Sequence, residues 1–222
     1  MLLKRKLLHE RKSNDQLLRI DSSPFGSNAS FSRQLTAEFV QQWQRTHPDG
    51  NVITRDVAAT RLASISAEWI DATETPESNR SSHQREILAM SNQLIAEVKA
   101  ADEYVVGVAM HNFSIPSVLK LWIDQIVRAG ETFAWVNNTP VGLLENKKAT
   151  FLVASGGVYD QGTPRADLNF IEPYLRSLFA MLGVTKTNFI TAGGTARFRD
   201  GVSRDIILRA ALASIDAQFQ PA

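Results

Sequence analysis

Residues 104–110 read YVVGVAM, and residues 111–116 read HNFSIP. The first segment, an unbroken apolar run, is typical of a strand that is buried on both faces of a parallel sheet. Pro116 suits the first turn of a helix, where its missing N–H costs nothing, and a helical pattern continues to Arg128. In open α/β sheets ligands bind beyond the carboxyl ends of the strands. Met110–Phe113 is therefore the first place where a site is expected.

The same succession of a short apolar run and a helical pattern recurs along the chain. Strands are expected at residues 16–20, 51–57, 103–110, 149–154 and 187–191, and helices at 31–43, 87–98, 116–128, 168–182 and 206–215. Five strands that alternate with five helices indicate an α/β fold with a doubly wound parallel sheet, helices on both faces and the strand order 2-1-3-4-5. Residues 58–82 are polar and predict a long loop, either a lid or partly disordered, and residues 132–142 predict a hairpin.

Length and composition bound the function. The 222 residues predict one domain, 16–222, preceded by an extension, 1–15. The absence of cysteine excludes disulfides and thiolate catalysis, so any redox chemistry needs a bound cofactor. The net charge of +1 gives no sign of nucleic-acid binding, and the apolar runs are too short to span a membrane. The N-terminal residues lack the apolar core of a secretory signal, so we expect a cytoplasmic protein.

Three loops of the predicted sheet open onto one crevice, because the chain reverses direction between its first and third strands. These loops are Ser23–Ser32, Met110–Phe113 and Ala154–Gly157. The first is rich in hydroxyls at the start of a helix and suits a phosphate, although Ser30 or Ser32 could equally serve only as the helix cap. Glycines in the third loop let the backbone approach a flat ring. A phosphate and a planar polar ring together describe a mononucleotide such as FMN.

Other chemistries lack their motifs. There is no G-x-G-x-x-G after a strand, no P-loop and no G-x-S-x-G elbow. The four histidines lack metal-ligand spacing, so no metal site is expected. His111 alone lies at the candidate site, as either a surface residue or a cofactor contact. Phe133 and Trp135 could stack on a substrate or merely pack, and Trp69 joins them as a candidate for the substrate pocket. Gly193 and Gly194 predict only a turn.

Several motifs together resemble the family of FMN-dependent NADH:quinone oxidoreductases and azoreductases, which has a flavodoxin-like fold. The resemblance extends from Leu17 to the C-terminus. Its motifs are Asp21–Pro24 with Ser30–Ser32, Met110–Phe113 with Ile115 and Pro116, Arg128–Phe133, and Ala154–Gly157.

The resemblance implies an enzyme in which the flavin carries the chemistry, so that no side chain acts as a catalytic nucleophile. NADH, or in some members NADPH, reduces FMN, and the reduced flavin passes two electrons to a quinone or an azo bond in a ping-pong cycle. The resemblance also implies a homodimer with two sites at its interface. The implied FMN-binding residues are Ser23, Ser30, Phe31, Ser32, Met110, His111, Asn112, Phe113, Ala154, Ser155, Gly156 and Gly157.

Two residues depart from the family pattern. His111 stands where the family usually has tyrosine, and Ser155 stands where arginine is common. Both leave the backbone contacts to the flavin in place but affect its tuning and the choice of acceptor. Two other hypotheses remain open at this stage: a non-enzymatic electron carrier of the flavodoxin type, and a regulatory or scaffold protein that has lost the cofactor.

Overall fold

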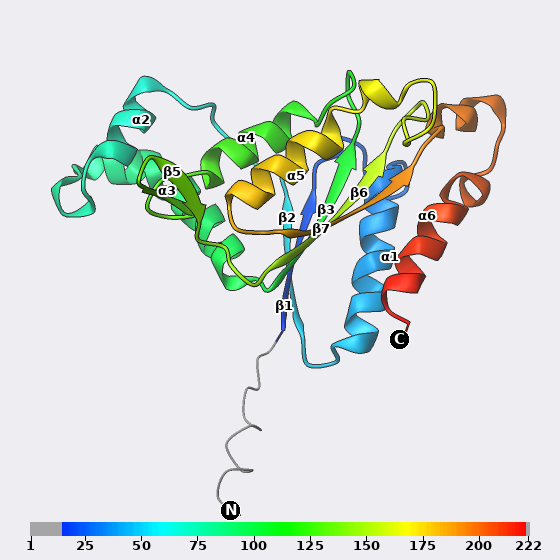
Figure 1. Cartoon of the computed structure of the whole chain (residues 1–222), viewed down its shortest axis with the longest axis horizontal. Coiled ribbons are helices and arrows are strands. Elements are labelled where there is room, and N and C mark those ends of the chain that lie inside the picture. The colour runs from blue at the N-terminus through cyan, green and yellow to red at the C-terminus, as the bar shows by residue number, and fades with distance from the viewer. Residues whose placement is uncertain (1–14, 221–222) are drawn as a thin grey trace, which may run out of the picture.

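The computed structural model describes residues 15–220, so the predicted N-terminal extension lies outside the described residues except for Asp15. A five-stranded parallel sheet runs through the molecule in the order β2-β1-β3-β6-β7 (Figure 1). Its strands are β1 (Gln16–Asp21), β2 (Asn51–Asp56), β3 (Glu103–Ala109), β6 (Lys148–Ala154) and β7 (Lys186–Ala192). Numbered along the chain, the sheet strands have the order 2-1-3-4-5, which confirms the predicted α/β fold.

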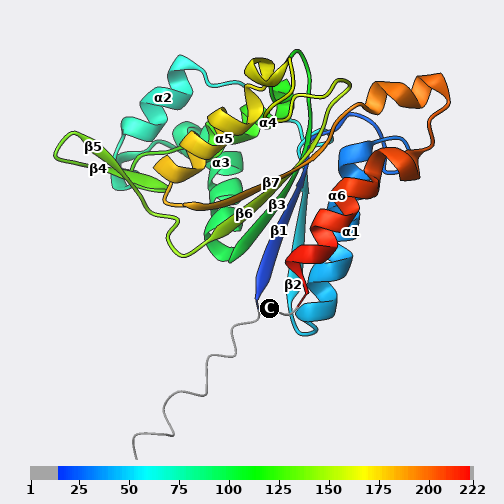
Figure 2. The ribbon, with the colours of Figure 1, turned by 45° about the vertical axis from the view of Figure 1, so that its right-hand side comes forward.

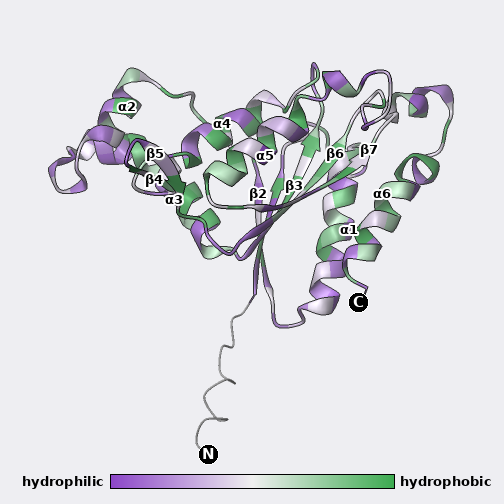
Figure 3. Ribbon diagram, in the orientation of Figure 1, coloured by the Kyte–Doolittle hydropathy of each residue, from purple (hydrophilic) through white to green (hydrophobic). Residues whose placement is uncertain are grey.

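Helices cover both faces of the sheet, as Figure 2 shows. Helices α1 (Phe31–Thr46) and α6 (Arg204–Gln218) lie on one face, and α3 (Ser82–Ala100), α4 (Ser117–Ile126) and α5 (Ile171–Met181) lie on the other. In Figure 3 hydrophobic and hydrophilic residues alternate along α1, α4 and α5, as in helices that turn one side to a core. The described chain therefore has two main hydrophobic cores, one on each side of the sheet.

Strand β3 explains why the run 104–110 carries so few polar residues. Tyr104, Val106 and Val108 pack into the core under α3, α4 and α5, whereas Val105 packs into the core under α1 and α6. Successive side chains of a strand point to opposite faces, and here both faces are covered. A continuous apolar sequence is the result.

Helix α1 is placed by its cap and by one buried hydrogen bond. Ser30 precedes the helix in an extended conformation, and its hydroxyl accepts from the backbone N–H of Arg33. Leu35, Phe39 and Trp43 recur every fourth residue and face the sheet. The indole of Trp43 donates to Glu103 Oε2 at 3.0 Å. This bond ties the last turn of α1 to the first residue of β3, at the amino edge of the sheet, so the capped start of α1 lies at the carboxyl edge.

The segment predicted as a long loop contains a helix, so that prediction was wrong in part. Residues 67–74 form α2 (Ala67–Glu74), and Glu77–Asn79 form a short 3₁₀ helix. Trp69 and Ala72 of α2 pack against Leu88 of α3 in a small separate core. This adds a sixth α-helix within residues 15–220, whereas five were expected.

The predicted hairpin is present as β4 (Phe133–Val136) paired antiparallel with β5 (Thr139–Gly142). It projects at the side of the molecule away from α1 and α6 (Figure 2). Within residues 15–220, every helix is too short or too polar to cross a membrane.

Candidate functional site

A cavity of about 480 Å³ opens at the carboxyl edge of the sheet. It is bounded by the loops after β1, β3 and β6, which are the three loops that the sequence predicted, and by a fourth segment after β7. The lining residues are Ser23, Phe25, Ala29, Ser30, Phe31, Ser32, Ala109, Met110, His111, Ala154, Gly156, Thr195, Ala196, Phe198, Arg199 and Arg204.

The loop after β1 presents unused hydrogen-bond donors to this cavity. Among the hydrogen bonds of residues 15–220, none uses the backbone N–H of Phe31 or Ser32 in the first turn of α1. The hydroxyls of Ser30 and Ser32 lie 3.2 Å apart beside them. Free amides, hydroxyls and the positive end of a helix dipole together form an anion site of the kind that binds phosphate. Ser30 therefore caps the helix and also faces the cavity.

Arg33 helps to fix the shape of this loop from outside the cavity lining. Its Nη2 donates to Ser23 O at 2.7 Å and to Asp56 Oδ1 at 2.9 Å, and its Nη1 lies 2.8 Å from Asp56 Oδ2. Asp21, buried at the end of β1, also accepts from Thr36 Oγ1 at 2.7 Å. One arginine thus joins the ends of β1 and β2 to the first turn of α1.

The contacts of Arg33 with Ser23 and Asp56, here called the clamp, shift the pKa values of Asp56 and Arg33. Burial acts to raise the pKa of Asp56, but the hydrogen bond and charge of Arg33, with the N–H groups of Ala59 and Ala58, bring it below its ordinary value. The pKa of Arg33 is raised, chiefly by its hydrogen bond to Asp56. Both groups therefore stay charged at neutral pH.

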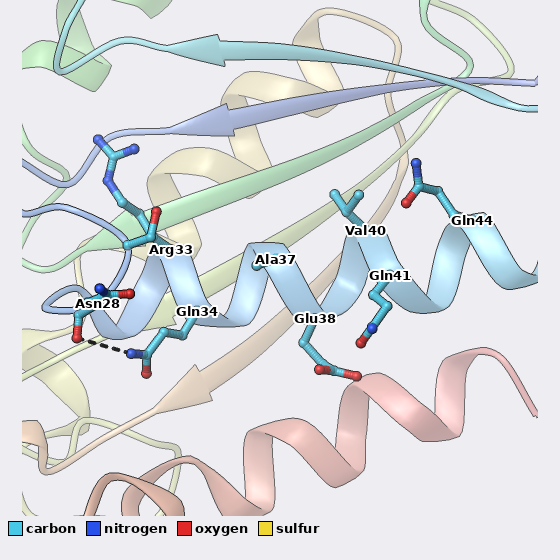
Figure 4. Close-up of a pocket in the computed structure, with 9 residues that line it drawn as sticks. Asn28, Arg33, Gln34, Ala37, Glu38, Val40, Gln41 and Gln44 are labelled. Carbon is cyan, nitrogen blue, oxygen red and sulfur yellow. Dashed lines mark hydrogen bonds between the residues drawn. The ribbon is translucent and has the colours of Figure 1, made fainter.

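A second hollow, of about 460 Å³, lies along the outer side of α1 (Figure 4). Figure 4 shows Arg33 turned away from it toward the strands, whereas the Gln34 amide reaches back to Asn28 O at 3.3 Å. Glu38 accepts from Gln42 at 2.9 Å. Arg33 and Glu38 are the charged residues that line this hollow, and both already have hydrogen-bond partners, so we assign it no chemistry.

The loop after β3 forms a tight two-residue turn. His111 and Ser114 exchange backbone hydrogen bonds of 2.9 and 3.0 Å across it. The residues between them have positive φ, 49° at Asn112 and 68° at Phe113, which is common for asparagine but costly for phenylalanine. Neither Asn112 N–H nor Phe113 N–H donates a hydrogen bond within residues 15–220. Strained backbone of this kind is typical of binding sites, and here it leaves two amides unpartnered.

The loop after β6 is the glycine-rich edge of the cavity. The Ser155 hydroxyl donates to Gly157 O at 2.9 Å, which closes the loop on itself. A Cβ on Gly156 would meet only Ala196 at 3.9 Å, so this side of the residue is open. The N–H groups of Gly156 and Gly157 donate to no group within residues 15–220. A planar ring can therefore approach this backbone closely and find donors there.

The fourth segment is a 3₁₀ helix, η3 (Thr195–Asp200), that follows Gly194. Its first N–H groups bond to the glycine loop: Thr195 N donates to Ser155 O at 3.0 Å, and Ala196 N donates to Gly156 O at 3.2 Å. Gly194 has a φ of 74°, so the two glycines mark more than the simple turn that the sequence predicted. The segment after β7 is therefore a wall of the cavity.

The structure brings most of the predicted cofactor-binding residues together. Eight line the cavity: Ser23, Ser30, Phe31, Ser32, Met110, His111, Ala154 and Gly156. The other four, Asn112, Phe113, Ser155 and Gly157, lie within two positions of lining residues in the sequence. The ring of Phe113 is partly exposed and meets Tyr159 edge-on at 6.0 Å.

The three aromatic residues predicted for a substrate pocket do not reach this cavity. Trp69 is buried in α2, and its indole donates to Gln125 Oε1 at 3.1 Å, so within this chain it is a packing residue. The rings of Phe133 and Trp135 are in edge-on contact in the β4–β5 hairpin, with their centroids 5.8 Å apart. Neither is among the residues that line the cavity, and Trp135 is 63% exposed.

The sequence interpretation missed the contribution of η3 and the start of α6. Phe198, Arg199 and Arg204 line the cavity beside the serines of the first loop. Their signal was available in the row of arginines at 197, 199 and 204, which follows the last strand at the edge where the site was expected.

Unpartnered amides and hydroxyls at a helix start, beside unpartnered loop amides at the carboxyl edge of a 2-1-3-4-5 sheet, are typical of a flavodoxin-like nucleotide-binding protein. A family model for the flavodoxin-like fold matches residues 15–219. An FMN-dependent NADH:quinone oxidoreductase of Acidobacterium capsulatum is 50% identical over 197 residues, which are 88% of this chain and 95% of that protein. An FMN-dependent NADH:quinone oxidoreductase 3 of Burkholderia lata is 47% identical over 181 residues, 82% of this chain and 87% of that protein. The chain belongs to the family of FMN-dependent NADH:quinone oxidoreductases.

Solved structures agree with this placement. An azoreductase from Bacillus anthracis str. Sterne superposes with a TM-score of 0.82 at 26% identity and covers 92% of this chain and 98% of its own. An FMN-dependent NADH-azoreductase from Bacillus anthracis str. Ames Ancestor, solved in complex with FMN, shares the fold with a TM-score of 0.82 at 23% identity, over 92% of this chain and 97% of its own.

Proposed function

We propose that this chain is an FMN-dependent NADH:quinone oxidoreductase that also cleaves aromatic azo compounds by reduction. One observation carries the assignment to this chain's own residues. Six backbone N–H groups without a partner in the described part of the chain, those of Phe31, Ser32, Asn112, Phe113, Gly156 and Gly157, lie at or beside one cavity of a size that suits a mononucleotide. The relatives named FMN-dependent NADH:quinone oxidoreductases support an enzyme over an electron carrier or a cofactor-free scaffold.

The residues divide between the two ends of the cofactor. Ser30, Ser32 and the amides at the start of α1 would hold the phosphate. Asn112, with the amides of Phe113, Gly156 and Gly157, would hold the polar edge of the ring. Bound FMN would supply the redox chemistry, which is the passage of two electrons from NADH, or NADPH, to a quinone or azo acceptor.

The protein contributes binding and orientation in this reaction. The contacts of Arg33 with Ser23 and Asp56 hold the loop Ser23–Ser32, the proposed phosphate loop, in shape before the cofactor binds. Preorganised donors of this kind bind without an ordering cost. Electron transfer through a bound flavin needs no nucleophilic side chain.

We further propose that the enzyme is a homodimer with its sites at the interface. The aromatic residues of the β4–β5 hairpin support this arrangement, since Trp135 is exposed and does not line the cavity of its own chain. In a dimer such residues would complete the partner's substrate pocket. Sedimentation of the flavin-loaded protein as a monomer at micromolar concentration would contradict this part. Since NADH is a cytoplasmic metabolite, we propose the cytoplasm as its location.

The assignment is tested by absorption spectroscopy. Purified protein is mixed with FMN, freed of excess flavin, and treated with NADH without air before a quinone is added. We expect a retained flavin band that bleaches with NADH and returns with the quinone. Retained flavin that NADH cannot bleach would favour the electron carrier, and loss of all flavin would contradict the FMN assignment.

A further inference from the structure

Arg204, the first residue of α6, lies against two aromatic rings at the wall of the cavity. The carbon centre of its guanidinium lies 4.2 Å from the ring centroid of Phe31 and 4.6 Å from that of Phe198. The two rings are themselves in edge-on contact at 5.9 Å. Phe31, Phe198 and Arg204 all line the cavity, so this three-residue cluster belongs to the surface that a ligand meets.

The guanidinium is also fixed to the phosphate loop. Nη2 donates to Ala29 O at 2.8 Å, and Nη1 donates to Gln34 Oε1 at 3.4 Å. Ala29 directly precedes Ser30, whose hydroxyl lies beside that of Ser32 at the cavity. A side chain ordered by two rings and two acceptors loses little further freedom when it binds a ligand.

The positive charge of Arg204 is not balanced by a carboxylate. Among the ion pairs of residues 15–220, none includes Arg204, whereas Arg33 next to the same loop is paired with Asp56 and Asp21. An ordered, partly buried and uncompensated guanidinium beside two serine hydroxyls and two free amides is arranged for a dianionic oxygen group.

We propose that Arg204 is a phosphate-recognition residue that makes this site select FMN over riboflavin. The proposal rests on the function proposed above and adds a determinant of which flavin is bound. Serine hydroxyls and amides can be satisfied by water when the phosphate is missing, so they discriminate weakly between the two flavins. A fixed guanidinium adds a charge-assisted contact that only the phosphorylated flavin can make.

A merely structural role for Arg204 makes a different prediction. In that case the arginine would only join the start of α6 to the loop at Ala29. Its loss would then loosen the loop that carries Ser30 and Ser32 and would weaken FMN binding equally at low and at high salt, because no charge that meets the phosphate is removed. The salt dependence of FMN binding, together with the ratio of the two flavin affinities, therefore separates recognition from support.

The experiment is a fluorescence titration of the full chain, stripped of flavin, with FMN and with riboflavin at low and high salt. Arg204→Gln keeps hydrogen-bond donors but removes the charge, and Arg204→Lys keeps the charge but loses the planar group. Arg176→Gln is the matched control, because Arg176 also lies over an aromatic ring, Phe189 at 4.9 Å, but does not line this cavity.

We expect Arg204→Gln to weaken FMN binding by about 10- to 100-fold and riboflavin binding by less than about threefold. We expect the salt dependence of FMN binding to decrease in the same variant. Arg176→Gln should change neither flavin. Equal weakening of both flavins, an unchanged FMN affinity, or a loss of FMN affinity that keeps the salt dependence of the unmodified chain would overturn the proposal.

Two further outcomes are decisive. If Arg204→Gln does not fold, the flavin affinities of Arg204→Lys are measured instead. A smaller loss of affinity confined to FMN supports the proposal, and an equal loss of affinity for both flavins overturns it. If the unmodified chain binds no FMN at all, the proposed function fails along with the proposal, whereas FMN binding that ignores Arg204 overturns the proposal alone.

Discussion

The carbonyl oxygen of Ser23 accepts two hydrogen bonds from the guanidinium of Arg33, at 2.7 Å from Nη2 and 3.2 Å from Nε. Ser23 ends the passage from β1 into the proposed phosphate loop, and Arg33 lies in the first turn of the helix that follows. The loop between them is therefore closed by a side chain rather than by regular secondary structure. Arg33, which helps to set the shape of this loop, does not itself line the cavity.

Replacement of Arg33 tests how strongly the fold and the shape of this loop depend on its side chain. Arg33→Ala removes the partner of Asp56 and both bonds to Ser23, and we expect a loss of about 2–4 kcal/mol in the free energy of unfolding. FMN affinity should fall with it, by roughly tenfold, because the loop loses its preorganised shape. Urea denaturation and FMN titration measure the two effects. Arg45→Ala, at the exposed end of the same helix, should stay within about 0.5 kcal/mol of the unmodified chain.

The serines at the start of α1 should have a larger effect on FMN than on the fold. Ser30→Ala with Ser32→Ala removes one helix cap, worth about 1 kcal/mol of stability, together with both hydroxyls at the proposed phosphate site. We expect FMN retention to fall by roughly tenfold or more. Ser66→Ala removes the equivalent cap of α2, which accepts from Trp69 N at 3.1 Å, away from the cavity. An unchanged FMN affinity in the double variant would count against the phosphate assignment.

The two glycines after β6 should respond in opposite ways to alanine. A Cβ at Gly156 has only Ala196 near it, so Gly156→Ala should fold normally but weaken FMN binding because the methyl group enters the cavity. A Cβ at Gly157 would come within 2.9 Å of the Tyr159 hydroxyl and 3.0 Å of its ring, so Gly157→Ala should lower the melting temperature unless Tyr159 moves. Calorimetry with and without FMN distinguishes them. Equal FMN affinity in Gly156→Ala and the unmodified chain would place the flavin ring elsewhere.

The clamp on Asp56 predicts a specific dependence of stability on pH. Its pKa in the folded chain lies below the ordinary value of 3.8, since the bonds from Arg33 and from Ala59 and Ala58 outweigh the opposing effect of burial. A lowered folded-state pKa means that this stabilisation is complete above the unfolded-state pKa and is lost as pH falls through the folded-state pKa.

Comparison of the unmodified chain with Asp56→Asn isolates this contribution. The difference in their unfolding free energy should be constant from about pH 7 to about pH 5 and should shrink as the pH approaches about 3. Urea denaturation at a series of pH values measures it. A difference that grows on acidification would reverse the sign and exclude the clamp as its source.

The sheet and three of its loops were predictable because their determinants are local or periodic. The continuous run at 104–110 marks a strand covered on both sides, and the alternation of strands and helices leaves few strand orders. Loops at the carboxyl ends of strands then meet at one edge, so Ser30, Met110 and Gly156 were found from their positions alone. Unpartnered backbone N–H groups are expected where a chain leaves a strand or starts a helix, whatever the side chains are.

Three features were not predicted from the sequence: helix α2, segment η3 and the contact of Arg204 with Phe31. Each lacks a local or periodic signal. Helix α2 is short, and its large apolar residues, Trp69 and Ile70, are adjacent, so only one of them can face the core and no helical stripe is visible. Segment η3 is a 3₁₀ helix with no buried residue within it. Arg204 meets Phe31 across most of the length of the chain, and no local pattern encodes that contact.

The backbone at Phe113 has a consequence for attempts to improve the protein. A phenylalanine at a φ of 68° costs roughly 1–3 kcal/mol, and glycine would adopt the same turn without that cost. A laboratory screen for heat resistance would therefore enrich glycine at position 113, which keeps the backbone N–H of the turn and gives up only the edge-on contact with Tyr159. Position 113 is thus a place where the present sequence leaves stability unused.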